Sequence, residues 1–216
     1  MITALLLAAA PLPTAVDAER AFARDAQRLG QWTAFRKYAA PDAVMFDPQA
    51  VWAHDLLKGL KDPPEAVRWW PGASFVSCDG RTAVNTGPWT RNRGTLHGYF
   101  TTVWQRDKDK WLWAYDGGDV LKTPRPIPRQ PFVRRASCRA KAPGAPIIPP
   151  PPLSQKKART TPEDQGRGES ADKTLGWDWK VDKKGGRRFR TYLWNGSHYE
   201  QVLFDHAPPP PPPRKS

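Results

Sequence analysis

The sequence predicts an α+β protein in which N-terminal helices pack on one side of a curved antiparallel sheet, followed by a smaller β-meander. The first observation is a helical period over residues 18–29 that changes to a period of two from Ser74 onward. The second is the placement of the eleven tryptophans, which all fall within 32–113 or 177–194. Tryptophan buries a large apolar surface when it packs, so these two regions mark the folded parts of the chain.

The helices are predicted from apolar stripes and from residues that begin or end helices. Residues 18–29 place apolar side chains on one face, and Gly30 ends this helix in the C-cap position. A second helix is expected at 32–38. Asp62 precedes two prolines that suit a first helical turn, so a third, short helix is expected to run from there to about Trp69.

The strands are predicted from short apolar runs and from alternation. Residues 43–46 and 51–52 form two short strands, and the segments 75–78 and 82–86 form a hairpin around the turn Asp79-Gly80. Further antiparallel strands are expected at 89–93, 98–106 and 111–116. Gly185-Gly186 and Asn195-Gly196 separate the three strands of a second meander, whose tryptophans require a partner surface.

Five segments follow from these patterns. Residues 1–18 resemble a secretory signal peptide, 19–121 form the main domain, and 122–173 form a basic, proline-rich linker that is expected to be mostly disordered. Residues 174–206 form the small three-stranded meander, which is expected to dock on the main domain. Residues 207–216 form a disordered proline-rich tail.

The net charge of +13 is concentrated in the linker, because residues 120–173 carry 12 basic and 4 acidic side chains. No helix-turn-helix, zinc-finger or RNA-binding pattern accompanies this charge, so no specific nucleic-acid partner is expected. A diffuse basic segment gives weak, salt-sensitive attraction to anionic surfaces. A role as a cell-envelope adaptor, acting through this linker, is therefore one of the hypotheses.

The apolar run Ile2–Ala10, followed by small residues, predicts export to the periplasm or secretion, although no Lys or Arg precedes the run. A cytoplasmic protein is the alternative. Cys78 and Cys138 either form a disulfide in an oxidising compartment or remain two unrelated thiols. Neither cysteine has a second ligand at metal-binding spacing, so no metal and no cofactor is expected.

The segment Tyr-Ala-Ala-Pro-Asp-Ala-Val-Met-Phe-Asp-Pro at 38–48 and the strand His-Gly-Tyr-Phe-Thr-Thr-Val-Trp-Gln-Arg at 97–106 resemble the NTF2-like superfamily. Within it, residues 19–121 are most similar to uncharacterised bacterial DUF4440 and SnoaL-like proteins. The resemblance implies a cone, with a bent antiparallel sheet around helices and a cavity at its open end. It also implies a small hydrophobic ligand and a homodimer through the sheet face.

Phe46-Asp47-Pro48 is similar to the segment that supplies the catalytic base in ketosteroid isomerases, which would place Asp47 at the cavity mouth. Desolvation would make such a carboxylate more basic. The positions that hold the oxyanion donors in those enzymes correspond to Phe22 and Thr101 here, which argues against steroid isomerisation. His54 is a second candidate acid or base near the same mouth.

The residues expected to contact a ligand are the aromatic and polar side chains that should reach the cavity, namely Trp32, Trp69, Trp89, Tyr99, Thr101, Trp104, Trp113 and Asp116. Besides the adaptor hypothesis, two functions of the expected cavity remain open. The chain either binds a small hydrophobic molecule without chemistry, or it is a cyclase, isomerase or hydratase that uses Asp47 as general base.

Overall fold

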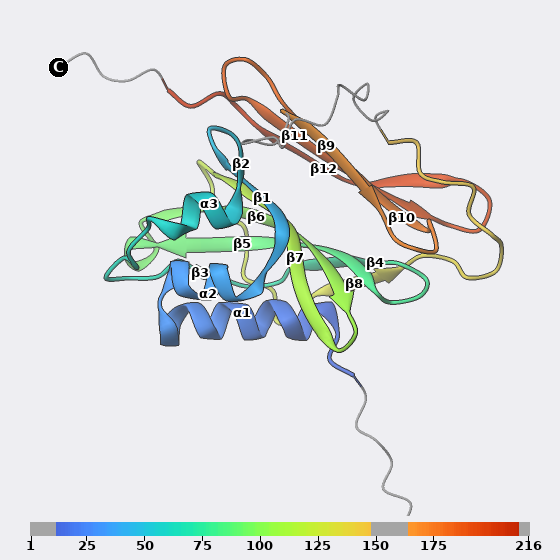
Figure 1. Cartoon of the computed structure of the whole chain (residues 1–216), viewed down its shortest axis with the longest axis horizontal. Coiled ribbons are helices and arrows are strands. Elements are labelled where there is room, and N and C mark those ends of the chain that lie inside the picture. Colours follow the sequence, from blue (N-terminus) through green and yellow to red (C-terminus); the bar gives the residue numbers. More distant parts are fainter. Residues whose placement is uncertain (1–11, 148–163, 212–216) are drawn as a thin grey trace, which may run out of the picture.

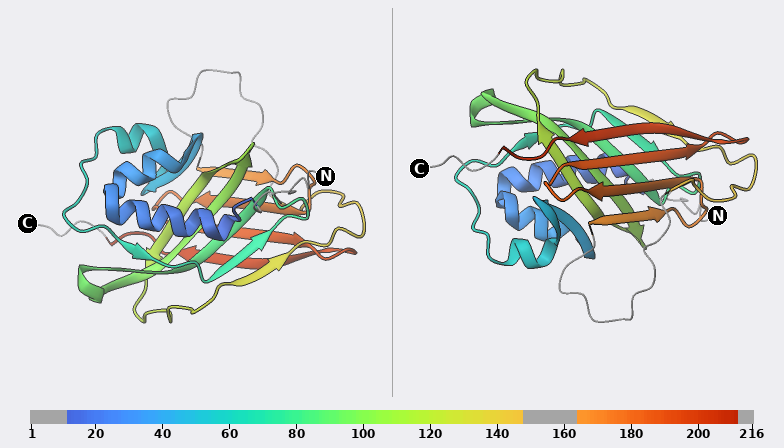
Figure 2. Two further views of the ribbon diagram at one scale, coloured as in Figure 1. Left: turned by 90° about the horizontal axis from the view of Figure 1, so that it is seen from below. Right: turned by 90° about the horizontal axis from the view of Figure 1, so that it is seen from above.

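The computed structural model describes residues 12–147 and 164–211. They form three layers, with helices on one face of a large sheet and a second sheet on its other face (Figures 1 and 2). Two segments that support earlier predictions lie outside the described residues. They are the apolar run at 2–10, which predicts export, and the proline run at 149–152, which belongs to the predicted linker. The end of the predicted tail, residues 212–216, also lies outside them. Within the described ranges no helix is long and apolar enough to cross a membrane.

The helix layer contains α1 (Ala15–Leu29), α2 (Gln31–Tyr38) and α3 (Ala53–Lys58). The α1 helix begins three residues earlier than predicted, because Thr14 and Asp17 form a capping box. The Thr14 hydroxyl accepts from the Asp17 backbone N–H at 3.2 Å, and the Asp17 carboxylate accepts from the Thr14 backbone N–H at 3.0 Å. The boundary predicted at residue 18 therefore falls inside the first turns of α1.

The helix predicted from Asp62 to Trp69 is wrong. Asp62 instead caps a different helix, because its carboxylate accepts from the backbone N–H of Thr33 at 3.0 Å and from the Thr33 hydroxyl at 2.6 Å. These bonds satisfy the N-terminus of α2, which Gly30 cannot cap with a side chain. The short helix lies earlier in the chain, as α3.

The large sheet has eight strands, of which seven follow the order β2-β1-β7-β6-β5-β4-β8 and β3 pairs with β5. It is mixed, whereas an antiparallel sheet was predicted, because β1 runs parallel to β7 and β8 parallel to β4. Its strands are β1 (Ala39–Asp47), β2 (Gln49–Trp52), β3 (Arg68–Trp69), β4 (Ala73–Val76), β5 (Thr82–Arg91), β6 (Leu96–Asp107), β7 (Lys110–Val120) and β8 (Phe132–Arg135).

The second sheet is antiparallel and has four strands, in the order β12-β11-β10-β9. Its strands are β9 (Gln165–Glu169), β10 (Leu175–Val181), β11 (Arg187–Trp194) and β12 (Tyr199–Ala207). A three-stranded meander and a mostly disordered linker were predicted, but β8 and β9 both lie in that linker. The described parts of 122–173 therefore contribute one strand to each sheet.

The sequence does not indicate β9 because the residues of this strand that face the tryptophans of β10 are glycines. Gly168 pairs with Trp177 and Gly166 with Trp179 across the β9–β10 ladder. A Cβ at Gly168 would lie 2.1 Å from the Trp177 ring, and one at Gly166 would lie 2.5 Å from the Trp179 ring. Each indole thus covers a glycine of the neighbouring strand, so β9 carries no apolar alternation of its own.

The second sheet covers the face of the large sheet opposite the helices (Figure 2). Its buried side chains form one apolar cluster with those of the large sheet. Tyr115 of β7 is central to it, with its ring centroid 4.5 Å from that of Phe189 and 6.4 Å from that of Trp179. The sheet face that the family resemblance assigns to a homodimer is therefore occupied by β9–β12 of the same chain.

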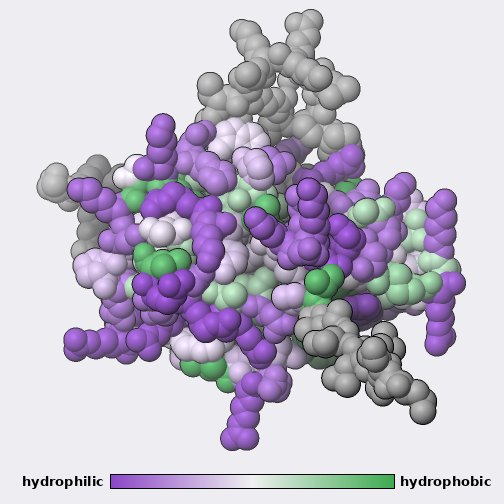
Figure 3. Space-filling view, turned by 60° about the horizontal axis from the view of Figure 1, so that its bottom comes forward, coloured by the Kyte–Doolittle hydropathy of each residue, from purple (hydrophilic) through white to green (hydrophobic). Residues whose placement is uncertain are grey.

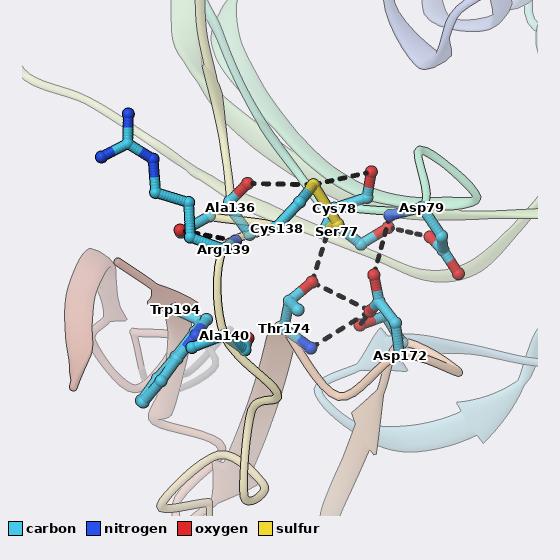
Figure 4. Close-up of a disulfide and its surroundings, with 12 residues drawn as sticks. Ser77, Cys78, Asp79, Ala136, Cys138, Arg139, Ala140, Asp172, Thr174 and Trp194 are labelled. Carbon is cyan, nitrogen blue, oxygen red and sulfur yellow. Dashed lines mark hydrogen bonds between the residues drawn. A yellow bond between two sulfur atoms is a disulfide. The ribbon is translucent and has the colours of Figure 1, made fainter. Parts of the chain in front are cut away.

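A disulfide within the large sheet and hydrogen bonds between the two sheets lie together at one end of the molecule (Figure 4). Cys78, in the turn after β4, forms a disulfide with Cys138, which follows β8. Thr174 accepts from the backbone N–H of Cys78 at 2.8 Å, and Asp172 accepts from that of Asp79 at 2.7 Å. The disulfide alternative is thus the one that the structure contains.

Candidate functional site

A pocket of about 380 Å³ lies between the helix layer and the large sheet. Its wall is mostly aromatic, and its polar residues gather where β7 ends. The lining consists of Phe22, Gln31, Trp32, Phe35, Met45, Phe46, Val67, Trp69, Trp89, Tyr99, Phe100, Asp116, Gly117, Gly118, Asp119, Val120 and Arg187.

The aromatic wall is fixed by contacts among rings from different elements. Phe22 of α1 packs edge-on against Phe35 of α2 and Trp69 of β3, with centroid distances of 4.7 and 4.8 Å. Trp32 packs edge-on against Phe35 at 5.4 Å. The Trp89 indole N–H donates to the backbone carbonyl of Tyr99 at 2.9 Å, which fixes that ring beside β6. Edge-to-face packing of this kind holds the wall in one arrangement.

Asp116 is one of two half-buried carboxyls in the pocket wall, beside Asp119. The Thr102 hydroxyl donates to its Oδ2 at 2.8 Å. Burial is the main cause that raises the pKa of Asp116 to about 7, and the nearby Glu19 carboxyl adds to it, while the Thr102 hydrogen bond and Arg187 oppose it. A carboxyl with such a pKa exchanges a proton near neutral pH and can act as either donor or acceptor.

Glu19, which the sequence analysis did not select, lies fully buried beneath the pocket wall. Its carboxyl accepts from the indole N–H groups of Trp69 at 2.8 Å and Trp104 at 2.6 Å, and from the Asn85 amide at 3.2 Å. Burial raises its pKa to about 7 against the lowering effect of these donors. Glu19 lies three residues before Phe22 on the buried face of α1, and this spacing is the signal that could have identified it.

Arg187 reaches the pocket from the second sheet. Its Nη2 donates to the Gly118 carbonyl at 2.6 Å, and its guanidinium lies 4.3 Å from the centre of the Phe46 ring. The second sheet therefore contributes a cation to the polar end of the pocket. The sequence predicts that the meander docks on the main domain, but nothing in its pattern distinguishes Arg187 from the basic residues around it.

Five of the predicted ligand contacts line this pocket, namely Trp32, Trp69, Trp89, Tyr99 and Asp116. Trp104 and Trp113 do not, because both are fully buried in the helix-side core with 0% of their surface exposed. Thr101 does not either, because it lies on the other side of the sheet, where its hydroxyl donates to Asp205 of β12 at 2.6 Å. Side chains alternate between the faces of a strand, so Thr101 cannot share a face with Phe100.

The two predicted catalytic residues lie outside the lining. Asp47 is exposed at the end of β1, in the turn to β2. His54 is exposed on α3, with its Nε2 3.1 Å from the Ala40 carbonyl oxygen. The structure thus gives neither residue a place in the pocket lining, and the carboxyls that do lie there belong to Asp116 and Asp119. Among the described residues there is no group of three or more His, Cys, Asp or Glu side chains that could hold a metal ion.

No protein-family model matches the chain, and no curated protein matches it. Among solved structures, the CamKII hub homology domain of Chlamydamonas reinhardtii matches with a TM-score of 0.38 and 17% sequence identity. The match covers 51% of this chain and 100% of that domain. A TM-score of this size carries no argument about fold or function, so both rest on the residues of this chain.

Proposed function

We propose that the chain is an exported, NTF2-like protein that binds a small, mainly apolar molecule carrying one polar group. The observation that carries this proposal is the aromatic-lined pocket with Asp116 at one end. Its volume of about 380 Å³ lies within the range of roughly 300–1,000 Å³ for small-molecule sites. The rings provide apolar contact, and Asp116 and Arg187 provide hydrogen bonds that orient the polar group.

Two further features support parts of this proposal. The disulfide between Cys78 and Cys138 favours an oxidising compartment, as the export hypothesis requires. The coverage of the sheet face by β9–β12 favours a monomer, since the surface on which a homodimer would form is already buried. Native mass spectrometry of protein from its own host measures both the oligomeric state and the mass of any retained ligand.

The binding proposal is tested with the neutral fluorescent probe N-phenyl-1-naphthylamine. Trp32→Ala removes part of the pocket wall and is expected to weaken probe binding about tenfold, as for the loss of one large apolar contact. Phe204→Ala is the matched control, because Phe204 is 55% exposed on β12 and does not line the pocket. Equal probe affinity in the wild type and in both Trp32→Ala and Trp89→Ala would contradict the proposal.

Asp116 favours proton transfer as a second candidate function. Its pKa of about 7 and its place in an apolar wall suit a general acid or base for a bound carbonyl compound. The test is deuterium incorporation from heavy water into the co-purified ligand. Exchange that the wild type accelerates and Asp116→Asn does not would support catalysis, while Asp47→Asn should exchange like the wild type. An uncatalysed rate with the wild type would leave binding as the function.

A further inference from the structure

A second hollow, of about 510 Å³, lies on the outer side of α1. Its basic residues are Arg20 and Arg24 of α1, Arg68 of β3 and Arg129 of the segment before β8, and its apolar residues include Trp70 and Pro128. We call it the arginine groove. Trp69 lines both this groove and the aromatic pocket, so the two sites share one residue.

No ion pair with a described residue neutralises the arginines of the groove. No acidic residue lines it. Arg20 makes one long hydrogen bond, at 3.5 Å, to the Gln130 side chain. The side chains of Arg24, Arg68 and Arg129 have no hydrogen bond or ion pair to another described residue.

The two nearest carboxylates of α1 are engaged elsewhere. Asp17 is held in the capping box by Thr14, although it still interacts electrostatically with Arg20 and Arg24. Asp25 is paired with Arg28 and Lys37 on the adjoining face of the helix. Hydrophilic side chains cover most of the molecular face that carries α1, with small hydrophobic areas between them (Figure 3). The groove thus presents guanidinium groups beside apolar surface.

The chemistry of the groove selects a phosphate group. Guanidinium presents paired N–H donors that match phosphate oxygens, and charge-assisted bonds of this kind are about twice as strong as neutral ones. A carboxylate offers one negative charge to four guanidiniums, whereas a phosphate monoester carries about −1.5 to −2 and three acceptor oxygens. Trp70 and Pro128 provide a surface for a flat or apolar body attached to that phosphate.

We propose that the arginine groove is a binding site for an organic phosphate, whose phosphate group lies among Arg20, Arg24, Arg68 and Arg129 and whose apolar part packs on Trp70. The phosphate can belong to a free nucleotide-like molecule or to the headgroup of an anionic lipid. This site is separate from the aromatic pocket, and it does not depend on what that pocket binds.

The test compares two double variants that remove the same charge. Arg24→Gln/Arg68→Gln alters the groove, and Arg93→Gln/Arg188→Gln removes two exposed arginines that do not line it. One arm measures binding of adenosine monophosphate and of adenosine by calorimetry at low ionic strength. The other measures co-sedimentation with vesicles that contain phosphatidic acid, whose headgroup is a phosphate monoester, and with phosphatidylcholine vesicles.

The groove variant is expected to bind either adenosine monophosphate or the anionic vesicles at least about tenfold more weakly than the control variant does. Adenosine and phosphatidylcholine should bind weakly to the wild type and to both variants, because adenosine has no phosphate and phosphatidylcholine has a phosphodiester balanced by a cation. The arm in which the loss occurs identifies the source. Two results would overturn the proposal. One is equal affinity of the two double variants in both arms. The other is adenosine binding as tight as that of the monophosphate, together with equal vesicle binding by the two double variants.

Discussion

The two faces of the large sheet are packed in different ways. On the helix side, α1 and α2 leave a pocket of about 380 Å³, and the carboxyl of Glu19 lies buried beneath its wall. On the other side, the second sheet fills the interface with apolar rings, and its Thr174 and Asp172 accept hydrogen bonds from the turn after β4. Helices meet a curved sheet along only part of their surface, whereas two sheets can interdigitate along their whole length. The filled face therefore provides stability, and the incompletely covered face provides room for a ligand.

Truncation of a ring on the filled face should have the largest effect on stability. Trp177→Ala removes an indole that is 5% exposed and leaves Gly168 uncovered, so the free energy of unfolding should fall by about 3–5 kcal/mol. Trp32→Ala, on the half-buried pocket wall, should lower it by less than about 2 kcal/mol. Urea denaturation measures both. If Trp32→Ala costs as much as Trp177→Ala, the proposed division between the two faces fails.

Loss of the disulfide should have the next largest effect. Cys78 and Cys138 are 60 residues apart in sequence, and a loop of that length predicts that the bond stabilises the fold by about 2–4 kcal/mol. The double variant Cys78→Ser/Cys138→Ser should therefore lower the midpoint of urea denaturation. Its probe affinity should match the wild type, since neither cysteine lines the aromatic pocket. The same midpoint for oxidised wild type and double variant would mean that the bond does not constrain the unfolded chain.

The buried carboxyls on the helix side should make stability depend on pH. Glu19 has an ordinary pKa of 4.5 in the unfolded chain and about 7 in the fold. Between these values the folded state keeps a proton that the unfolded state releases, so the free energy of unfolding falls as pH rises from about 4.5 to 7. The expected loss is on the order of 3 kcal/mol, and Asp116 contributes in the same direction.

Glu19→Gln is the variant that separates this cause from others, because an amide does not ionise over this range. Urea denaturation at pH 5 and at pH 8 should show a smaller difference for Glu19→Gln than for the wild type. Should the two proteins lose the same stability between these pH values, the dependence would have to come from other groups.

The smallest effect is expected from substitution of Asp47. The family resemblance predicts that this residue lies at a cavity mouth, but the structure places it in an exposed turn. Asp47→Asn should change the free energy of unfolding by less than about 0.5 kcal/mol, as for other exposed positions. Its probe affinity should stay within about twofold of the wild type. A tenfold loss of probe affinity in this variant would show that the ligand extends beyond the described pocket to β1.

The sequence predicted the elements whose signals are local. Apolar stripes located α1 and α2, and turns such as Asp79-Gly80 and Asn195-Gly196 located the hairpins. It did not predict β9, because the partner of each Trp ring there is a glycine rather than another apolar residue. It misassigned Asp62, whose carboxylate caps a helix 29 residues earlier in the chain. Contacts between distant segments leave no local pattern.

The sequence also predicted only part of the candidate site, because some of its residues are placed by contacts between distant segments. Trp32, Trp69, Trp89, Tyr99 and Asp116 line the pocket, and they were selected as aromatic and polar side chains that should reach a cavity of the kind that the family resemblance implies. Glu19 was missed because a glutamate on a helix is normally assigned to the solvent face. Its burial depends on two indole donors and one amide, from strands 50 to 85 residues further along the chain.

The disulfide also determines what happens when the backbone is cut. Cys78 and Cys138 enclose the exposed segment after β7, which contains Lys122 and Arg129. Trypsin cleavage at either residue produces two fragments that remain covalently linked through sulfur and paired through the β4–β8 ladder. The nicked protein should therefore migrate as one species on a non-reducing gel and as two after reduction. A cut in this loop leaves both sheets attached, so the loop can be lost to a protease without releasing the C-terminal half.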